Sequence, residues 1–409
     1  MTLPLHDSPV PELDLPPGGA RPPQGARPDA AQVRVLLERA ARFPTLAGRY
    51  RLPASGPVPE FDTLPTLPAA ELRAALWQRL RTGLLRDTGA RLYLGGGTAA
   101  QPAATVLPQG MFATEVLRVW HPFRRADVVV NLARGSRFAP QRDLCDLLAA
   151  RSGCSVIPYS RPEAQERMSW LAFLEQAGAT ALAVDTGTLR ELLQSCRQRG
   201  RVLGWITTLV WVGAGLDRAT AELISAVLPG ARVWGLYGSV DCWAVATQNP
   251  RCPREVVHPL PYQHVEALDG ELLVTTLHPA AVAPVIRVRT GDGGEFTECP
   301  CGTGRPAVRL TGQVADMFNF RGIRLHRAEL AELARGMSEV AEAEVVVLDA
   351  GLPTERLCWR ITAAAGEPAD HYLEDWVLEN LLGADVALAQ LAGANPDAIE
   401  VVAENGARP

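Results

Sequence analysis

The sequence predicts an α/β protein: a large N-terminal domain with mainly parallel sheets, a β-rich subdomain within it, and a small α+β C-terminal domain. From about Asp127 to Gly235, short apolar strands alternate with segments of helical periodicity, which is typical of a parallel sheet covered on both faces. After Asp241 the pattern changes to half-buried strands, and beyond Gly312 a third pattern mixes helices and strands. The 409 residues suffice for two or three cores.

Each expected element rests on apolar residues spaced for its type. Helical spacing recurs in 31–50 and 68–86, whereas residues 1–30 are rich in Pro and Gly and predict a disordered arm. In the central segment we expect strands at 127–131, 155–158, 181–184, 209–212 and 232–234, and helices at 140–150, 162–177, 188–199 and 217–228. In the β-rich subdomain (about 242–310) we expect strands at 271–276 and 285–288, and in the C-terminal domain (313–409) helices at 326–337 and 368–382 with strands at 344–348, 356–361 and 399–402.

The composition narrows the classes of function. A formal net charge of −5 provides no basic field, so nucleic acid is not expected as a partner. The sequence has no apolar run of about 20 residues and no basic flank before an apolar block, so we expect neither a membrane span nor a signal peptide. Eight cysteines spread over a long chain suit the reducing cytoplasm. The chain contains no lysine, so its positive side chains are arginines and histidines.

Four motifs carry candidate chemistry. A glycine-rich loop at 94–102 can present backbone N–H groups to phosphate, and 234–241 places a tyrosine and a carboxylate after the last parallel strand. The strand at 285–292 ends in an aspartate that can accept ribose hydroxyls, and 310–325 precedes Glu329 on a helix. Taken alone, the glycine-rich loop also fits an ordinary turn, 234–241 fits a buried aromatic turn, and the aspartate that ends 285–292 fits an Asx turn.

Two short-spaced pairs predict a structural zinc site. Cys252 lies six positions before His258, and Cys299 lies two positions before Cys301. A hairpin-like subdomain that joins the pairs would form a closed tetrahedral site. The alternatives are ordinary unpaired thiols, or Cys242 as a substitute ligand.

The order and spacing of the motifs resemble the adenylate-forming superfamily over about residues 70–345. Cys299-Pro300-Cys301-Gly302 is similar to the phenylacetate–CoA ligase branch, in which comparable cysteines and a histidine have a structural role. The resemblance implies an AMP-binding domain at 31–312 and a mobile C-terminal domain. It also implies a two-step reaction, in which a carboxylate and ATP form an acyl adenylate and a thiol, usually CoA, then displaces AMP.

The resemblance also assigns nucleotide-binding residues position by position. Gly97 and Thr98 would cradle phosphate, Tyr237 with Gly238 would contact adenine, and Asp292 would bind the ribose. ATP or AMP is therefore the expected cofactor.

The implied catalytic residues are Thr98, Asp241 and Arg324, with Asp241 at the position associated with Mg²⁺. The motifs depart from the family pattern: Gln101 replaces a lysine, Gln313 replaces the hinge arginine, and the usual C-terminal lysine is absent.

Two functions follow. In the first, the chain activates an aromatic or other small carboxylic acid as acyl-AMP for CoA, a carrier-protein thiol or an amine. In the second, it is a degenerate, lysine-less member that binds a nucleotide, an acyl adenylate or a partner protein, or acts as an acyltransferase. The sequence leaves the acid, the acceptor and a homodimer open.

Overall fold

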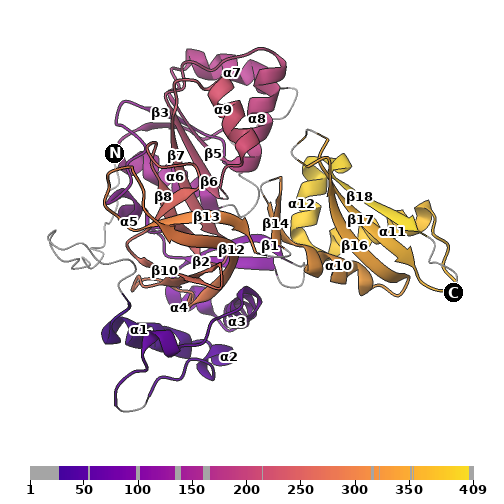
Figure 1. Ribbon diagram of the computed structural model, residues 1–409, viewed down its shortest axis with the longest axis horizontal. Helices are drawn as coiled ribbons and strands as arrows, with labels where there is room; N and C mark the ends of the chain where they lie inside the picture. Colours follow the sequence, from indigo (N-terminus) through magenta and orange to yellow (C-terminus); the bar gives the residue numbers. More distant parts are fainter. Residues whose placement is uncertain are drawn as a thin grey trace.

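The structure is a computed structural model that describes residues 27–53, 56–97, 102–133, 140–159, 166–213, 215–314, 317–321, 323–350, 352 and 354–404. Figure 1 shows a larger part, drawn in indigo to orange, and a smaller part in yellow beside it. An 11-stranded mixed sheet forms the centre of the larger part. Residues 1–26 of the predicted arm lie outside the described residues, whereas Ala30 already begins the first helix.

One half of this sheet is parallel, as the strand–helix alternation predicted. Its strands follow the order β4-β3-β5-β6-β7, and β5 is buried along most of its length because helices cover it. The Asp185 and Asp217 side chains cap the two helices that follow β5 and β6. The strands are β3 (Val128–Asn131), β4 (Ser155–Ile157), β5 (Ala181–Asp185), β6 (Thr208–Gly213) and β7 (Arg232–Ser239), and the helices are α6 (Pro140–Arg151), α7 (Arg167–Gln176), α8 (Thr186–Gln198) and α9 (Arg218–Val227).

The other half is antiparallel and continuous with the first, which corrects the expectation of mainly parallel sheets. Strand β7 extends to Ser239, where a tight turn with Trp243 in the left-handed region leads into antiparallel β8. The β-rich segment therefore adds strands to the same sheet. Its strands are β8 (Trp243–Gln248), β9 (Val256–Pro259), β10 (Gln263–Leu268), β11 (Glu271–Thr276), β12 (Val288–Thr297) and β13 (Ala307–Gln313).

The N-terminal helices pack beneath the antiparallel half (Figure 1). The buried Arg39 guanidinium donates to the carbonyl oxygens of Thr276 and His278, at 2.9 and 2.6 Å, and so ties the first helix to β11. The described elements that precede β3 in the chain are α1 (Ala30–Ala41), α2 (Pro44–Ala47), the 3₁₀ turn η1 (Phe61–Thr63), α3 (Ala69–Arg81), α4 (Leu84–Thr88), the hairpin β1 (Arg91–Gly97) and β2 (Pro102–Leu107), and α5 (Ala113–Leu117).

The C-terminal part has its own core, which includes the fully buried Phe320 and Trp359. It contacts the larger part where its last helix, α12 (Val386–Ala394), packs on β1. Across the same junction, Arg190 lies 4.0 Å from Glu355. Its elements are β14 (Met317–Phe320), β15 (Ile323–His326), α10 (Arg327–Arg335), β16 (Val340–Leu348), β17 (Arg356–Ala363), α11 (His371–Ala384), α12 (Val386–Ala394), the 3₁₀ turn η2 (Pro396–Ala398) and β18 (Ile399–Glu404).

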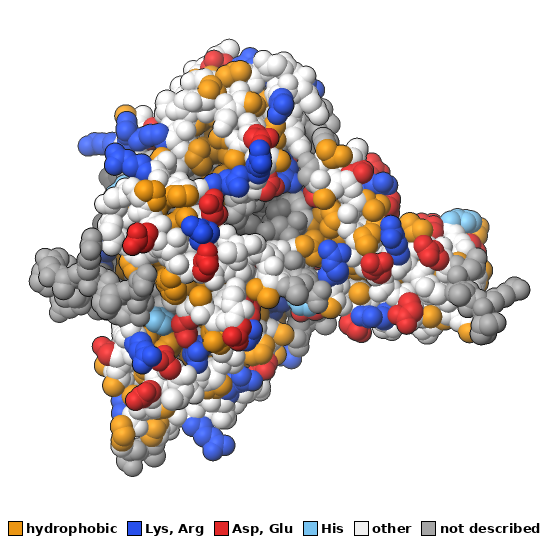
Figure 2. All heavy atoms as spheres, viewed as in Figure 1, with side chains coloured by type: hydrophobic (Ala, Val, Ile, Leu, Met, Phe, Trp, Pro, Cys, Tyr) orange, Lys and Arg blue, Asp and Glu red, His pale blue; other side chains and the backbone are white. Residues whose placement is uncertain are grey.

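Charges of both signs are interspersed over the face drawn in Figure 2, without a broad basic area. Within the described ranges, no helix is both long enough and apolar enough to cross a bilayer.

Gly235 on β7 allows the Trp211 side chain to lie flat against the sheet. A Cβ at Gly235 would lie 2.2 Å from the Trp211 ring. We expect Gly235→Ala to lower the free energy of unfolding by about 1–3 kcal/mol or more, because a fully buried indole on β6 cannot move aside freely. Urea unfolding measures this, with Gly230→Ala as the control because a Cβ there meets nothing within 4 Å. Equal effects of the two changes would contradict the steric reason.

Candidate functional site

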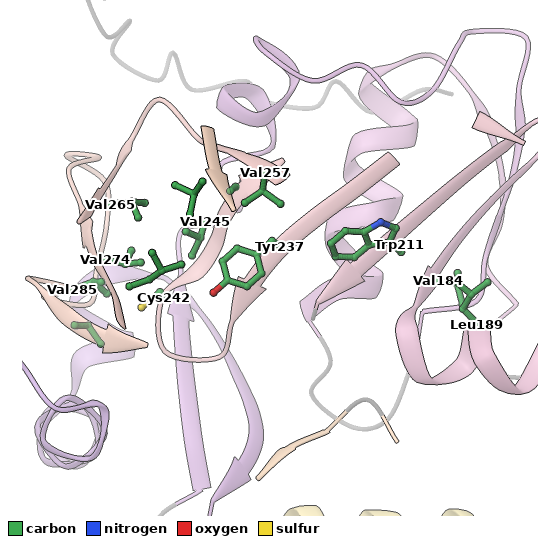
Figure 3. Close-up of a cluster of buried hydrophobic side chains, with 14 of the residues drawn as sticks. Val184, Leu189, Trp211, Tyr237, Cys242, Val245, Val257, Val265, Val274 and Val285 are labelled. Atoms are coloured by element: carbon green, nitrogen blue, oxygen red, sulfur yellow. The ribbon is translucent and has the colours of Figure 1, made fainter. Parts of the chain in front are cut away.

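Two of the predicted nucleotide-binding residues meet in the larger part. The Tyr237 hydroxyl on β7 donates a short hydrogen bond to the Asp292 carboxylate on β12, although 55 positions separate the two residues. Both side chains are buried. Figure 3 shows the Tyr237 ring between Cys242 and Trp211, with valine side chains beyond Cys242. The structure thus joins the second and third motifs of the sequence in one site.

Gln313 adds an amide group beside this pair. It lies directly opposite Asp292 in the β12–β13 ladder. Its Nε2 atom is buried and lacks a hydrogen-bond partner in the part of the chain that the structure describes. A buried amide donor without a partner is costly, so this nitrogen is available to a ligand group.

Gly238 has a local structural reason to be glycine. A Cβ there would lie 2.1 Å from the Trp243 carbonyl oxygen, so the close approach of β7 and β8 requires its absence.

The first and fourth motifs are less fully described. Gly97 ends β1 opposite Pro102, and Arg324 lies opposite Asn319 in the β14–β15 hairpin. Thr98 and Gln101 lie outside the described residues.

Asp241, expected near Mg²⁺, forms a bidentate ion pair with Arg73 on α3. The Arg73 Nε lies 2.8 Å from Oδ1 of Asp241, and Nη2 lies 2.9 Å from Oδ2. The charge of Asp241, against the opposing effect of burial, raises the pKa of Arg73 above its ordinary value. Sequence reasoning missed Arg73, since an arginine in an ordinary amphipathic helix gives no signal of a partner 168 positions away.

A small cavity adjoins Asp241. Its volume is about 20 Å³, and its lining is largely apolar, including Leu76, Phe112 and Trp243. Asp241, Cys242 and Thr105 add polar atoms. Such a volume holds a water molecule or a small group, not an aromatic ring. Cys242 therefore lines this cavity rather than joining the metal cluster, in which it was the alternative ligand.

The four predicted zinc ligands lie together. The ligand atoms of Cys252, His258, Cys299 and Cys301 are all within 4.8 Å of one another. Tetrahedral zinc with bonds of about 2.3 Å requires sulfur atoms about 3.8 Å apart, so the cluster fits the metal with a small contraction. His258 Nδ1 lies 2.9 Å from the Pro306 carbonyl oxygen, which leaves Nε2 directed at Cys301, 3.2 Å away. The hydrogen bond from Nδ1 to the Pro306 carbonyl oxygen orients the ring as metal sites require.

The thiols of this cluster differ electrostatically. Burial raises the pKa of the Cys301 thiol, but hydrogen bonds with Thr303, Asn249 and Cys299 together outweigh this effect, and the pKa falls to about 6. Burial raises the pKa of Cys252 to about 12.

The sequence matches no protein-family model and no curated protein. Solved structures share its fold. A crystal structure of 2-hydroxyisobutyryl-CoA ligase with 2-HIB-AMP and CoA, in the thioesterification state, has a TM-score of 0.66 and 17% identity, covering 97% of this chain and 92% of that one. A malonyl-CoA ligase complex with methylmalonyl-CoA and AMP has a TM-score of 0.54 and 21% identity, covering 78% and 71%. The amide bond synthetase McbA from Marinactinospora thermotolerans has a TM-score of 0.54 and 17% identity, covering 78% and 66%.

The chain therefore has the fold of adenylate-forming acyl-CoA ligases and amide synthetases. The TM-score also varies with the state of the first ligase. It is 0.66 for the thioesterification state, 0.55 for an open conformation and 0.57 for a postadenylation state.

Proposed function

We propose that the chain is an adenylate-handling ligase, which transfers a small acyl group from acyl-AMP to a thiol, such as CoA or a carrier-protein thiol, or to an amine. The hydrogen bond between Tyr237 and Asp292 carries this proposal, because it unites two nucleotide motifs in the fold of such ligases. Asp292 would accept the ribose hydroxyls, the Tyr237 ring would contact adenine, and the Gln313 amide would donate to the same nucleotide.

The cavity beside Asp241 supports a small acid as the substrate. Its lining is largely apolar, which suits an uncharged acyl chain, and its volume of about 20 Å³ suits no more than the small end of such a chain. Pyrophosphate exchange against a panel of aliphatic and aromatic carboxylic acids tests both the ligase activity and the size of the acid.

The Cys₃His cluster supports two further proposals. We assign it a structural zinc ion, because all four ligand positions are filled by protein and no open position remains for a substrate. The same cluster supports placing the chain near the phenylacetate–CoA ligase branch.

We expect ATP-driven adenylation to be slower than acyl transfer from a supplied acyl adenylate. Departure of pyrophosphate builds negative charge, and a chain without lysine lacks the ammonium that usually meets it; one such lost contact costs about 10²–10³ in rate. Attack on a finished adenylate begins from an activated carbonyl and depends less on that cation. Rapid-quench measurement of both half-reactions compares them.

The matched variant restores two charges, Gln101→Lys with Gln313→Arg, and is expected to raise adenylation more than acyl transfer. Wild-type pyrophosphate release near the common enzyme rate of about 10 per second would contradict this expectation. Transfer without any adenylation would favour the second candidate, an acyltransferase or adenylate-binding protein, which the pairing of Asp241 with Arg73 also supports.

A further inference from the structure

The Arg73–Asp241 ion pair involves a carboxylate that lines the proposed acyl site, and it leaves little room for a metal at Asp241. Both carboxylate oxygens accept a hydrogen bond from the same planar guanidinium, at 2.8 and 2.9 Å. The side chains of Arg73 and Asp241 retain 23% and 12% of their exposure, so solvent screens the pair only partly. Bidentate pairs of this kind are among the strongest charge-assisted contacts in proteins.

The surroundings of Asp241 do not supply a metal site either. Mg²⁺ requires near-octahedral oxygen coordination, usually with one or two carboxylates. Among the described residues, the only group of three or more potential metal ligands is the Cys₃His cluster, and Asp241 is not part of it. The residues around Asp241 therefore do not fit the expected Mg²⁺ role, because a magnesium ion would have to displace the guanidinium that both carboxylate oxygens bind.

Arg73 keeps the Nη1 amino group, with its two N–H donors, for a further anion. Within the described part of the chain, Nη1 makes no hydrogen bond, and it is not among the fully buried polar atoms that lack a partner. The carboxylate of Glu329, on α10 of the C-terminal part, also acts electrostatically on Arg73.

We propose that Arg73 takes the place of a divalent cation at Asp241, neutralising this carboxylate and directing Nη1 toward the anionic phosphate of the nucleotide. The proposal rests on the proposed function and deepens it: the site binds AMP or an acyl adenylate without Mg²⁺ at Asp241. Neutralisation is required because an unpaired Asp241 carboxylate would repel the phosphate.

The test combines AMP titration, with and without Mg²⁺, and unfolding of four proteins: wild type, Arg73→Met, Asp241→Asn and the double variant. We expect wild-type affinity for AMP to change less than about twofold with Mg²⁺, and Arg73→Met to weaken it about tenfold or more. Adding Asp241→Asn to Arg73→Met should recover much of that loss, because it removes the repulsive charge. Arg73→Lys should recover only part, since an ammonium cannot form the bidentate fork.

Arg79→Met is the matched control, because Arg79 lies on the same helix and forms an ion pair with Asp87, 2.9 Å away, outside the site. This variant should bind AMP as the wild type does. The inference is overturned if Mg²⁺ strengthens wild-type AMP binding tenfold and Asp241→Asn abolishes that gain. If AMP binds to none of the proteins, the proposed function fails. The unfolding midpoints of the four proteins still test the ion pair by themselves. Additive effects of the two substitutions on the midpoint would show that Arg73 and Asp241 do not interact, and would overturn the inference.

Discussion

Loss of zinc from the Cys₃His cluster is expected to unfold the antiparallel half of the large sheet. Protein purified without chelator should contain about one zinc ion per chain, and chelation should abolish the main thermal transition or lower its midpoint by several degrees. The reason is energetic: structural zinc contributes apparent binding free energies of about 10–16 kcal/mol in small domains, as much as the whole stability of a typical protein. Metal analysis and thermal unfolding measure the two quantities.

Cys301→Ser and Cys154→Ser form the matched pair for this experiment. Cys301 is a predicted ligand, whereas Cys154 is a partly exposed thiol that contacts the Arg124 carbonyl oxygen instead. Only Cys301→Ser should lose zinc and stability. Wild-type protein that is folded and cooperative without bound metal would refute the zinc assignment.

The clustering of the four proposed zinc ligands could be predicted from sequence because the spacing within each pair is local. Each pair spans at most seven positions. Cys252 precedes β9 and His258 lies on it, while Cys299 and Cys301 precede β13, the neighbour of β9 in the sheet. The strands of the parallel half were also predictable, because burial on both faces leaves continuous apolar runs such as 181–184.

The antiparallel half was harder to predict because its strands depend on long-range pairing. Strands β9 and β13 meet through only two pairs, Val257 with Val308 and Val256 with Arg309. The segment 256–259 has no alternation of its own, so only its partners make it a strand. Strand β7 was expected to end at Trp234, but pairing with β8 extends it to Ser239 and so joins the two halves of the sheet.

In the candidate site, too, local motifs could be predicted from the sequence and long-range partners could not. Tyr237, Asp241 and Asp292 were identified by their motifs, and the structure brings Tyr237 and Asp292 into contact. The partner of Asp241 could not be identified from sequence, because a guanidinium on a distant helix becomes specific only when the chain folds. The motif resemblance assigned a metal ion as the partner of the Asp241 carboxylate. In the structure the Arg73 guanidinium binds this carboxylate.

Asp292→Ala is expected to abolish nucleotide binding at accessible concentrations. Two ribose hydroxyls that donate to one carboxylate would contribute about 1.5–3 kcal/mol each, so their loss weakens AMP binding by about 10²–10⁴-fold. The substitution also leaves the buried Tyr237 hydroxyl without its acceptor, which costs about 1–3 kcal/mol of unfolding free energy. Calorimetric titration with AMP measures the first effect, and urea unfolding measures the second.

Tyr237→Phe separates these two effects. It removes the same hydrogen bond and keeps the aromatic ring, but leaves the Asp292 carboxylate in place to accept the ribose. If Asp292 binds ribose, the phenylalanine variant should retain AMP affinity within about tenfold, because only one neutral donor is lost beside the carboxylate. Equal losses of affinity in the two variants would instead mean that Asp292 acts only by holding Tyr237. Unchanged affinity in Asp292→Ala would remove the ribose from this site altogether, because no weaker contact could conceal the loss of two charge-assisted hydrogen bonds.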